Sequence, residues 1–207
     1  MEEPKHKLSL RSIRLEALGD GIFAVAMTIL AIELKWPHLE DTSYKTFVTA
    51  FHEILLSLLC YVISFIVLGI MWFGHRMIFE YIGKTNRHFI YLGILFYMMV
   101  CLVPLSTRFL AENSLQWGTI FVYGLNLSLC NLSLYVQWSY GINHEGLLER
   151  ELPAEVKKEA RFLFLISPVV YTIAIILSLW FPIASIIIFV ITPLLYLIPN
   201  KLDKYLP

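Results

Sequence analysis

The residues that say most about function lie along the first apolar segment of the chain, from about Ala17 to Leu34. One face of this segment, taken as a helix, carries small side chains at alternating steps of four and three residues. They are Ala17, Gly21, Ala24, Thr28 and Ala31. Inside a membrane, a stripe of small residues lets helices approach closely. The stripe therefore predicts packing against another helix, either within one subunit or between copies of the chain around an axis.

A second stripe beside the first consists of aliphatic side chains. Its members are Leu18, Val25, Ile29 and Ile32, with Thr28 at its border. Around a symmetry axis this row would form a narrow hydrophobic constriction, and such rings gate ion flow by excluding water. The same spacing also fits a row that faces lipid or the protein core, so spacing alone leaves both interpretations open.

Charged residues mark the two boundaries of this segment. Arg14 and Asp20 stand at its beginning, and Glu33 and Lys35 at its end. A carboxylate inside an apolar run is costly, so Asp20 is a candidate functional residue, with Arg14 as its nearest opposite charge. Because six residues separate the two, they do not share one helix face. Asp20 therefore requires an unwound first turn or a third partner.

Candidates for that partner lie at the same expected depth on the next two apolar segments. Trp72 and His75 are three residues apart and share a helix face, and Asn86 precedes the third segment. Together with Arg14 and Asp20 they have the donors and acceptors for one hydrogen-bonded cluster, in which His75 would respond to pH. The other interpretation is that Trp72 and His75 anchor their helix at the membrane interface.

The composition of the chain requires a membrane. Of its 207 residues, 58% are hydrophobic and 15% are charged, against about 45–50% and about 25% in soluble domains. The mean hydropathy is +0.69. A soluble domain of this size has too little interior to bury so much apolar surface. The chain is therefore expected to be an integral membrane protein, and soluble enzyme classes, disorder and nucleic-acid binding are excluded.

Six apolar stretches are long enough, some only marginally, to cross a bilayer core of about 30 Å as helices. They are expected at 17–34, 54–73, 89–105, 117–138, 162–180 and 183–198. Solid apolar runs favour helices over the alternating strands of a membrane barrel. The sequence thus predicts an all-α integral membrane protein with six transmembrane helices, as a single domain over residues 1–207.

The basic residues predict the orientation. When alternate loops are grouped, thirteen Lys and Arg residues fall on one side and three, Lys35, Lys45 and Arg108, on the other. Basic loops stay in the cytoplasm. Both termini are therefore expected on the cytoplasmic side of the cell membrane (plasma or inner), which independently supports an even number of spans.

No cofactor, metal site or enzyme activity is expected. Cys60, Cys101 and Cys130 lie in apolar runs without CxxC spacing, and the histidines lack metal-ligand spacing. No Ser/His/Asp set, HExxH motif or carboxylate pair occurs at membrane depth.

The alternative to a channel is a secondary transporter of a small solute or ion, which would have polar groups and interrupted helices near the midplane. The fourth stretch is unusually polar, and Ser167-Pro168 is able to kink the fifth. The polar residues are Asn126, Ser128, Asn131, Ser133 and Gln137. We favour a packing role, because such residues commonly bridge membrane helices.

The string from Arg14 to Thr28, RLEALGDGIFAVAMT, resembles the signature of the transmembrane protein 175 family, whose first helix begins with an R-x-x-x-F-S-D pattern. The W-x-x-H at Trp72 and His75 and the six-span layout extend the resemblance over the whole chain. The chain departs from the pattern at Leu18-Gly19, where the family has Phe-Ser.

This resemblance implies a potassium-permeable channel whose first helices line a central pore. The animal members carry two six-span repeats, so a chain with one repeat would act as a homotetramer in the lipid bilayer. Monovalent cations would be its only further partners, with K⁺ as the permeant ion. The sequence has no T-V-G-Y-G filter loop, so only modest selectivity for K⁺ over Na⁺ is expected.

The resemblance also assigns positions. The constriction of the family corresponds to Val25, with further apolar layers at Ile29 and Ile32 and with Thr28 between them. These coincide with the aliphatic stripe, and the small Val25 implies a somewhat wider constriction. By the same resemblance, the cytoplasmic end of the pore helix is supported by Arg14, Asp20, Trp72, His75 and Asn86.

Overall fold

The computed structural model describes residues 10–34, 43–113, 116–144, 146–149 and 153–195. These ranges form a bundle of helices, which confirms the expected all-α class. The elements are β1 (Leu10–Arg11), α1 (Ile13–Ile32), α2 (Tyr44–Tyr81), β2 (Lys84–Thr85), α3 (Arg87–Cys101), α4 (Val103–Glu112), α5 (Trp117–Asn143), α6 (Ala154–Leu177) and α7 (Pro182–Leu195).

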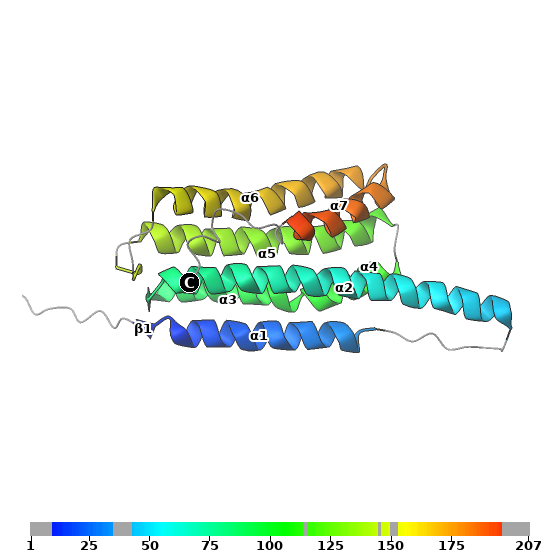
Figure 1. Cartoon of the computed structure of the whole chain (residues 1–207), viewed down its shortest axis with the longest axis horizontal. Helices are drawn as coiled ribbons and strands as arrows, with labels where there is room; N and C mark the ends of the chain where they lie inside the picture. The colour runs from blue at the N-terminus through cyan, green and yellow to red at the C-terminus, as the bar shows by residue number, and fades with distance from the viewer. Residues whose placement is uncertain (1–9, 35–42, 114–115, 145, 150–152, 196–207) are drawn as a thin grey trace, which may run out of the picture.

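The helices run along one common direction and are stacked in layers (Figure 1). Helix α1 lies at one edge of the bundle, where it packs against α2, α3 and α4. Helices α6 and α7 lie at the opposite edge, and α5 packs between α3 and α6. One side of α1 is therefore turned away from the rest of the protomer.

Five helical segments in the described part of the chain are long and apolar enough to cross a membrane. They are Ile13–Ile32, Phe47–Tyr81, Arg87–Glu112, Trp117–Asn143 and Ala160–Leu177. A sixth apolar helix, Pro182–Leu194, is shorter. The chain is thus a multi-pass membrane protein, and its sixth predicted span, 183–198, is represented by a short helix.

The second helix is much longer than predicted. The apolar stretch indicated a span over 54–73, whereas α2 covers 38 residues from Tyr44 to Tyr81. At about 1.5 Å per residue it measures about 57 Å, well beyond the thickness of a bilayer core. The hydrophobic window marked only the part that matches the membrane, while the helix continues through the polar residues on both sides. In Figure 1 its first turns project past the other helices.

The third span is interrupted. A single helix over 89–105 was predicted, but α3 ends at Cys101 and α4 begins at Val103. Pro104, in the first turn of α4, has no backbone N–H to donate to the preceding turn. Helix α4 then continues to Glu112, and within it the hydroxyl of Thr107 donates to the carbonyl oxygen of Val103, at 2.8 Å.

A short antiparallel ribbon at one end of the bundle was not predicted. β1 pairs with β2 in the register Leu10 with Thr85 and Arg11 with Lys84. The backbone N–H of Lys84 also donates to the carbonyl oxygen of Leu147, at 3.3 Å. The ribbon therefore fastens the start of α1 to the turn after α2 and to the segment after α5. Two-residue strands have no hydrophobic periodicity by which the sequence could predict them.

The segment between the fourth and fifth spans is shorter than the gap between the predicted spans 117–138 and 162–180. Helix α5 continues to Asn143, and α6 already begins at Ala154, with Pro153 directly before its first residue.

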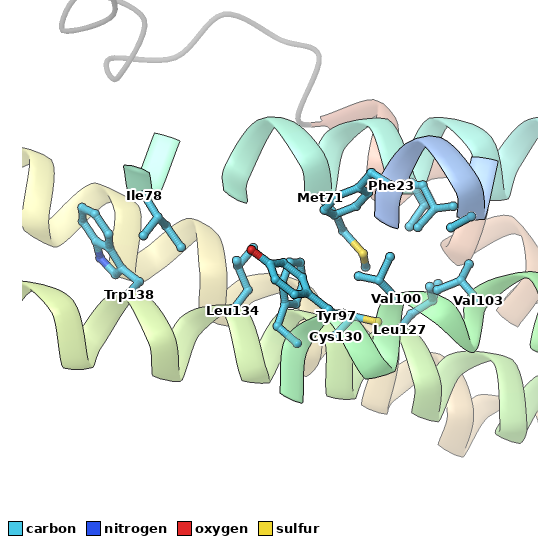
Figure 2. Packing of buried hydrophobic residues seen from close by; sticks show 14 of the residues in the cluster. Phe23, Met71, Ile78, Tyr97, Val100, Val103, Leu127, Cys130, Leu134 and Trp138 are labelled. Atoms are coloured by element: carbon cyan, nitrogen blue, oxygen red, sulfur yellow. The ribbon is translucent and has the colours of Figure 1, made fainter. Parts of the chain in front are cut away.

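The core lies between α1, α2, α3 and α5. Figure 2 shows side chains from all four helices in one cluster, among them Phe23, Met71, Tyr97 and Leu134. Each of these four side chains is at most 3% exposed. This cluster is the packed surface on which α1 rests.

Candidate pore-lining helix and its supporting contacts

Helix α1 has one buried face and one uncovered face. Its buried residues recur at steps of three and four, as expected for an amphipathic contact with neighbouring helices. They are Leu15, Gly19, Phe23, Ala26 and Leu30. The rotation of α1 in the protomer is thereby fixed, and the aliphatic stripe points away from α2, α3 and α4.

All four residues of the predicted constriction lie on the uncovered face. The exposed fractions are 57% for Val25, 36% for Ile29 and 78% for Ile32, and Thr28 is exposed between them. The hydroxyl of Thr28 donates to the carbonyl oxygen of Val25, at 2.8 Å. Its oxygen can still accept hydrogen bonds or contact a cation.

The stripe of small residues lies on the same face. Ala17, Gly21, Ala24, Thr28 and Ala31 are all exposed in the protomer. A Cβ atom added at Gly21 would have no neighbour within 4 Å. In the described part of the chain this stripe is not used for packing within one subunit, which was one of the two interpretations of the sequence.

The uncovered face of α1 differs from the exposed face of α2. Helix α2 exposes large side chains that suit acyl chains, including Phe47, Phe51, Leu55 and Phe65. Helix α1 exposes alternating small and branched residues instead, and faces of this kind favour close approach between helices.

Asp20 is paired with α2. The indole Nε1–H of Trp72 donates to Asp20 Oδ1, at 2.8 Å, and the guanidinium of Arg76 lies 5.9 Å from the centre of the Trp72 ring system. The structure therefore supplies the third partner that the spacing of Arg14 and Asp20 called for. Arg14 itself is exposed, and among the described residues no hydrogen bond or ion pair connects it to Asp20 or Trp72.

His75 packs directly against Phe23 and Gly19 of α1, and it is also hydrogen-bonded to α1 through a residue that the sequence did not single out. Its side chain is fully buried, and its Nε2 lies 2.8 Å from the hydroxyl oxygen of Tyr97 on α3. That hydroxyl donates to the backbone carbonyl oxygen of Leu15 on α1, at 2.7 Å. A tyrosine inside an apolar run carries no signal that its partner is a backbone oxygen 82 positions away.

Asn86 belongs to a separate set of contacts. Its side-chain oxygen accepts from the backbone N–H of Phe89, at 2.9 Å, and so caps the first turn of α3. Its Nδ2 donates to the hydroxyl of Tyr140 on α5, at 2.9 Å. The five predicted support residues thus include one direct pair, Asp20 and Trp72. His75 is hydrogen-bonded to α1 through Tyr97, and Asn86 caps the first turn of α3.

The far end of α1 is held by an ion pair that was not predicted. Arg108 on α4 donates to Glu33 Oε2, at 2.7 Å, and to Glu112 Oε1, at 2.9 Å. The sequence had assigned Glu33 and Arg108 to the same side of the membrane without pairing them.

Of the five polar side chains noted on α5, one bridges to another helix in the described part of the chain, while Ser128 Oγ and the Gln137 amide are buried there without a hydrogen-bond partner. Asn126 donates to Ser106 Oγ on α4, at 3.0 Å, whereas Asn131 donates to the carbonyl oxygen of Leu127 in its own helix, at 3.0 Å. Ser133 bonds to the carbonyl of Cys130, also within α5, at 2.9 Å. Among the described residues, no group of three or more His, Cys, Asp or Glu side chains is placed to hold a metal ion.

Comparison with known proteins gives consistent matches. The family model "Endosomal/lysosomal potassium channel TMEM175" matches residues 14–104, which include α1 and the support residues. A potassium channel of Chryseobacterium sp. (strain P1-3) is 28% identical over 188 residues, which cover 91% of this chain and 93% of that protein. A potassium channel of Streptomyces collinus is 29% identical over 169 residues, which cover 78% of this chain and 80% of that protein.

Among solved structures, the crystal structure of a lysosomal potassium-selective channel TMEM175 homolog from Chamaesiphon minutus matches with a TM-score of 0.76 and 25% identity. The match covers 90% of this chain and 96% of that chain. The relatives are named as ion channels, which confirms the prediction that the chain is not an enzyme. The chain is thus similar over most of its length to prokaryotic potassium channels, and its residues 14–104 match the TMEM175 family.

Proposed function

We propose that the chain forms a potassium-permeable cation channel, as a homotetramer whose four α1 helices line the central pore. One observation carries the proposal: the face of α1 with Val25, Thr28, Ile29 and Ile32 is uncovered, while the opposite face is packed on the protomer. The names of the bacterial relatives, which are potassium channels, support the choice of ion.

Val25 forms the narrowest ring of the proposed pore, and Ile29 and Ile32 form further apolar layers. A hydrophobic ring passes ions only when it is wide enough to stay wet, so small changes in its radius control the current. Thr28 adds a ring of hydroxyl oxygens between these layers. Without carbonyl rings of the T-V-G-Y-G kind, which the sequence lacks, selectivity for K⁺ over Na⁺ is modest.

Arg14, Asp20, Trp72, His75 and Asn86 support the cytoplasmic end of the pore helix in this proposal. The bond between Asp20 and Trp72 and the contact of His75 with Tyr97 both fix the first turns of α1 on its own protomer. Both termini lie in the cytoplasm, and the protein resides in the cell membrane as one channel domain. The excess of basic residues in alternate loops supports this orientation.

The test is potassium flux combined with chemical modification of α1. The purified protein is reconstituted into liposomes with a potassium gradient, in a background in which the exposed Cys101 is replaced by serine. In this background Val25→Cys is treated with a water-soluble thiol reagent. We expect the current to be blocked, because Val25 faces the water-filled pore. Val62→Cys on α2, 42% exposed, is the matched control, and it should be unaffected because it faces lipid.

Absence of potassium flux above that of empty vesicles would contradict the proposal. Block at Val62 instead of Val25 would move the pore to another helix. Uptake that saturates with a solute and is too slow for a pore would favour a secondary transporter.

A further inference from the structure

The hydroxyl of Tyr97 lies at a junction of three helices. Tyr97 is on α3, its hydrogen-bond partner His75 is on α2, and its other partner, the carbonyl of Leu15, is in the first turn of α1. The side chain is only 2% exposed and lies inside the hydrophobic cluster shown in Figure 2. It is therefore a polar link in surroundings that offer few other hydrogen-bond partners.

The direction of these hydrogen bonds follows from the atoms. A carbonyl oxygen can only accept, so the single hydroxyl proton of Tyr97 is donated to Leu15. The tyrosine oxygen must then accept from His75, which places the ring proton of His75 on Nε2. His75 Nδ1 is buried, and among the described residues it has no partner. Tyr97 consequently supplies the hydrogen bond that holds His75 in place.

Helix α1 approaches this link closely because residue 19 is a glycine. A Cβ atom at Gly19 would lie 2.5 Å from His75 Cε1 and 2.8 Å from the hydroxyl oxygen of Tyr97. Gly21 lies two residues further along α1, on the uncovered face, and has free space around it. The absence of a side chain at Gly19 thus allows α1 to lie directly against the hydroxyl of Tyr97.

From this geometry we infer that Tyr97 is a positioning residue for ion conduction, which holds the first turns of α1 back from the pore axis. The inference rests on the proposed function, in which the opposite face of α1 lines the pore. The bond to Leu15 pulls α1 toward α2 and α3. Without it, four apolar faces would move inward to reduce their contact with water, and the narrowed pore would dewet.

The experiment uses Tyr97→Phe in the full-length protein, recorded as single channels in lipid bilayers. A buried hydrogen bond of this kind shifts an equilibrium by up to about tenfold, so we expect the open probability to fall by about that factor. The current through an open channel and the potassium-over-sodium reversal potential should be unchanged, because Tyr97 does not line the pore. A purely structural role would lower the number of folded channels and leave the open probability of each one intact.

Tyr123→Phe is the matched control. Tyr123 is also fully buried, and its hydroxyl bonds to Ser64 at 3.0 Å, but this contact joins α5 to α2 and does not involve α1. Its removal should leave the open probability at the wild-type level. An equal loss in both variants would show a general effect of buried hydroxyls and would overturn the inference.

A second arm covers the case in which Tyr97→Phe yields too little folded protein. Gly19→Ala, which keeps the tyrosine, is then compared with the wild type, because the added methyl group acts on the same contact between α1 and Tyr97. A lower open probability at an unchanged open-channel current is expected, and an unchanged open probability would overturn the inference. If Val25→Cys is blocked by the thiol reagent while Tyr97→Phe opens normally, only the role of Tyr97 fails. If Val25→Cys is not blocked, the proposed pore fails, and the role of Tyr97 fails with it.

Discussion

Arg108 on α4 is joined to Glu33, the residue that directly follows α1, by a hydrogen-bonded ion pair of 2.7 Å. Together with the contacts at the other end, this pair fixes α1 to its protomer at both boundaries of the membrane segment. The middle of α1, with Val25 and Thr28, is held only by its buried face. The two fastened ends therefore help to determine which side of the helix stays uncovered in the protomer.

The ion pair predicts an asymmetric effect of its two halves on stability. Arg108→Gln removes the bonds of the guanidinium to both Glu33 and Glu112, whereas Glu33→Gln leaves Arg108 bonded to Glu112. The arginine variant should therefore be the less stable of the two. Because both side chains are partly exposed, with exposed fractions of 39% and 30%, water screens the ion pair and the coupling in a double-mutant cycle should be small.

Thermal unfolding of the detergent-solubilised protein measures this difference. Glu112→Gln serves as the control, since it removes the neighbouring bond at 2.9 Å and leaves the contact with α1 intact. Equal melting temperatures for Arg108→Gln and Glu33→Gln would contradict the predicted asymmetry.

Val25→Ala is predicted to raise the conductance of the open channel and to weaken its preference for potassium over sodium. The shorter side chain widens the proposed constriction, so an ion sheds less of its hydration water as it passes. Val62→Ala is the matched control, because Val62 is a similarly exposed valine on α2. Single-channel current and reversal potential under potassium and sodium measure the effect. If Val25→Ala matches the wild type in both quantities, the constriction lies elsewhere.

The sequence predicted which residues of α1 share a face better than it predicted which side chains α1 contacts. The periodicity of the small and aliphatic residues was sufficient to group Val25, Thr28 and Ile32 on one face, because helix geometry alone decides which residues share a side. The helices that cover the opposite face of α1 were not predictable, and neither was the hydrogen bond from Tyr97 to Leu15. Both depend on packing between segments far apart in the chain. Hydropathy likewise located the second span without showing that its helix continues to Tyr44 and Tyr81.

Thr28→Val is predicted to reduce selectivity without affecting the fold. Among the described residues, the hydroxyl of Thr28 bonds only to the carbonyl of Val25 in its own helix, and valine keeps the branched shape. Loss of the hydroxyl ring removes the polar ligands between the two apolar layers, so the potassium-over-sodium permeability ratio should move toward one. Thr172→Val on α6, where the hydroxyl makes the same kind of local bond to Pro168 at 2.7 Å, should leave the ratio unchanged. Reversal potentials under bi-ionic conditions decide between the two outcomes.

The two glycines beside Asp20 are predicted to respond in opposite ways to replacement by alanine. A methyl group at Gly19 would overlap with His75 and Tyr97, and overpacking of this kind costs about 1–3 kcal/mol. Gly21 has free space around it in the protomer, and alanine there favours the helix by up to about 1 kcal/mol. Thermal unfolding of the two variants should therefore show a lower melting temperature for Gly19→Ala than for Gly21→Ala, and the reverse order would contradict the close contact at Gly19.

Asp20→Asn separates the charge of this residue from its hydrogen bond. The asparagine side-chain oxygen can still accept from Trp72 Nε1, so the contact of 2.8 Å is retained while the negative charge is lost. An exposed carboxylate near the mouth of the pore attracts cations, and this attraction is screened as the Debye length falls from about 30 Å at 0.01 M salt to about 10 Å at 0.1 M. The potassium current of the variant should therefore be reduced in low salt and approach that of the wild type in high salt.

The matched control for Asp20→Asn is Glu155→Gln, at the start of α6 on the opposite edge of the bundle. It removes one negative charge from each subunit, but far from α1, so its current should follow the wild type at every salt concentration. A loss at Asp20 that does not depend on salt would mean that the charge acts on the fold of the first turns of α1. In that case Asp20 would belong with Tyr97 among the residues that position the helix, and it would not attract the ion directly.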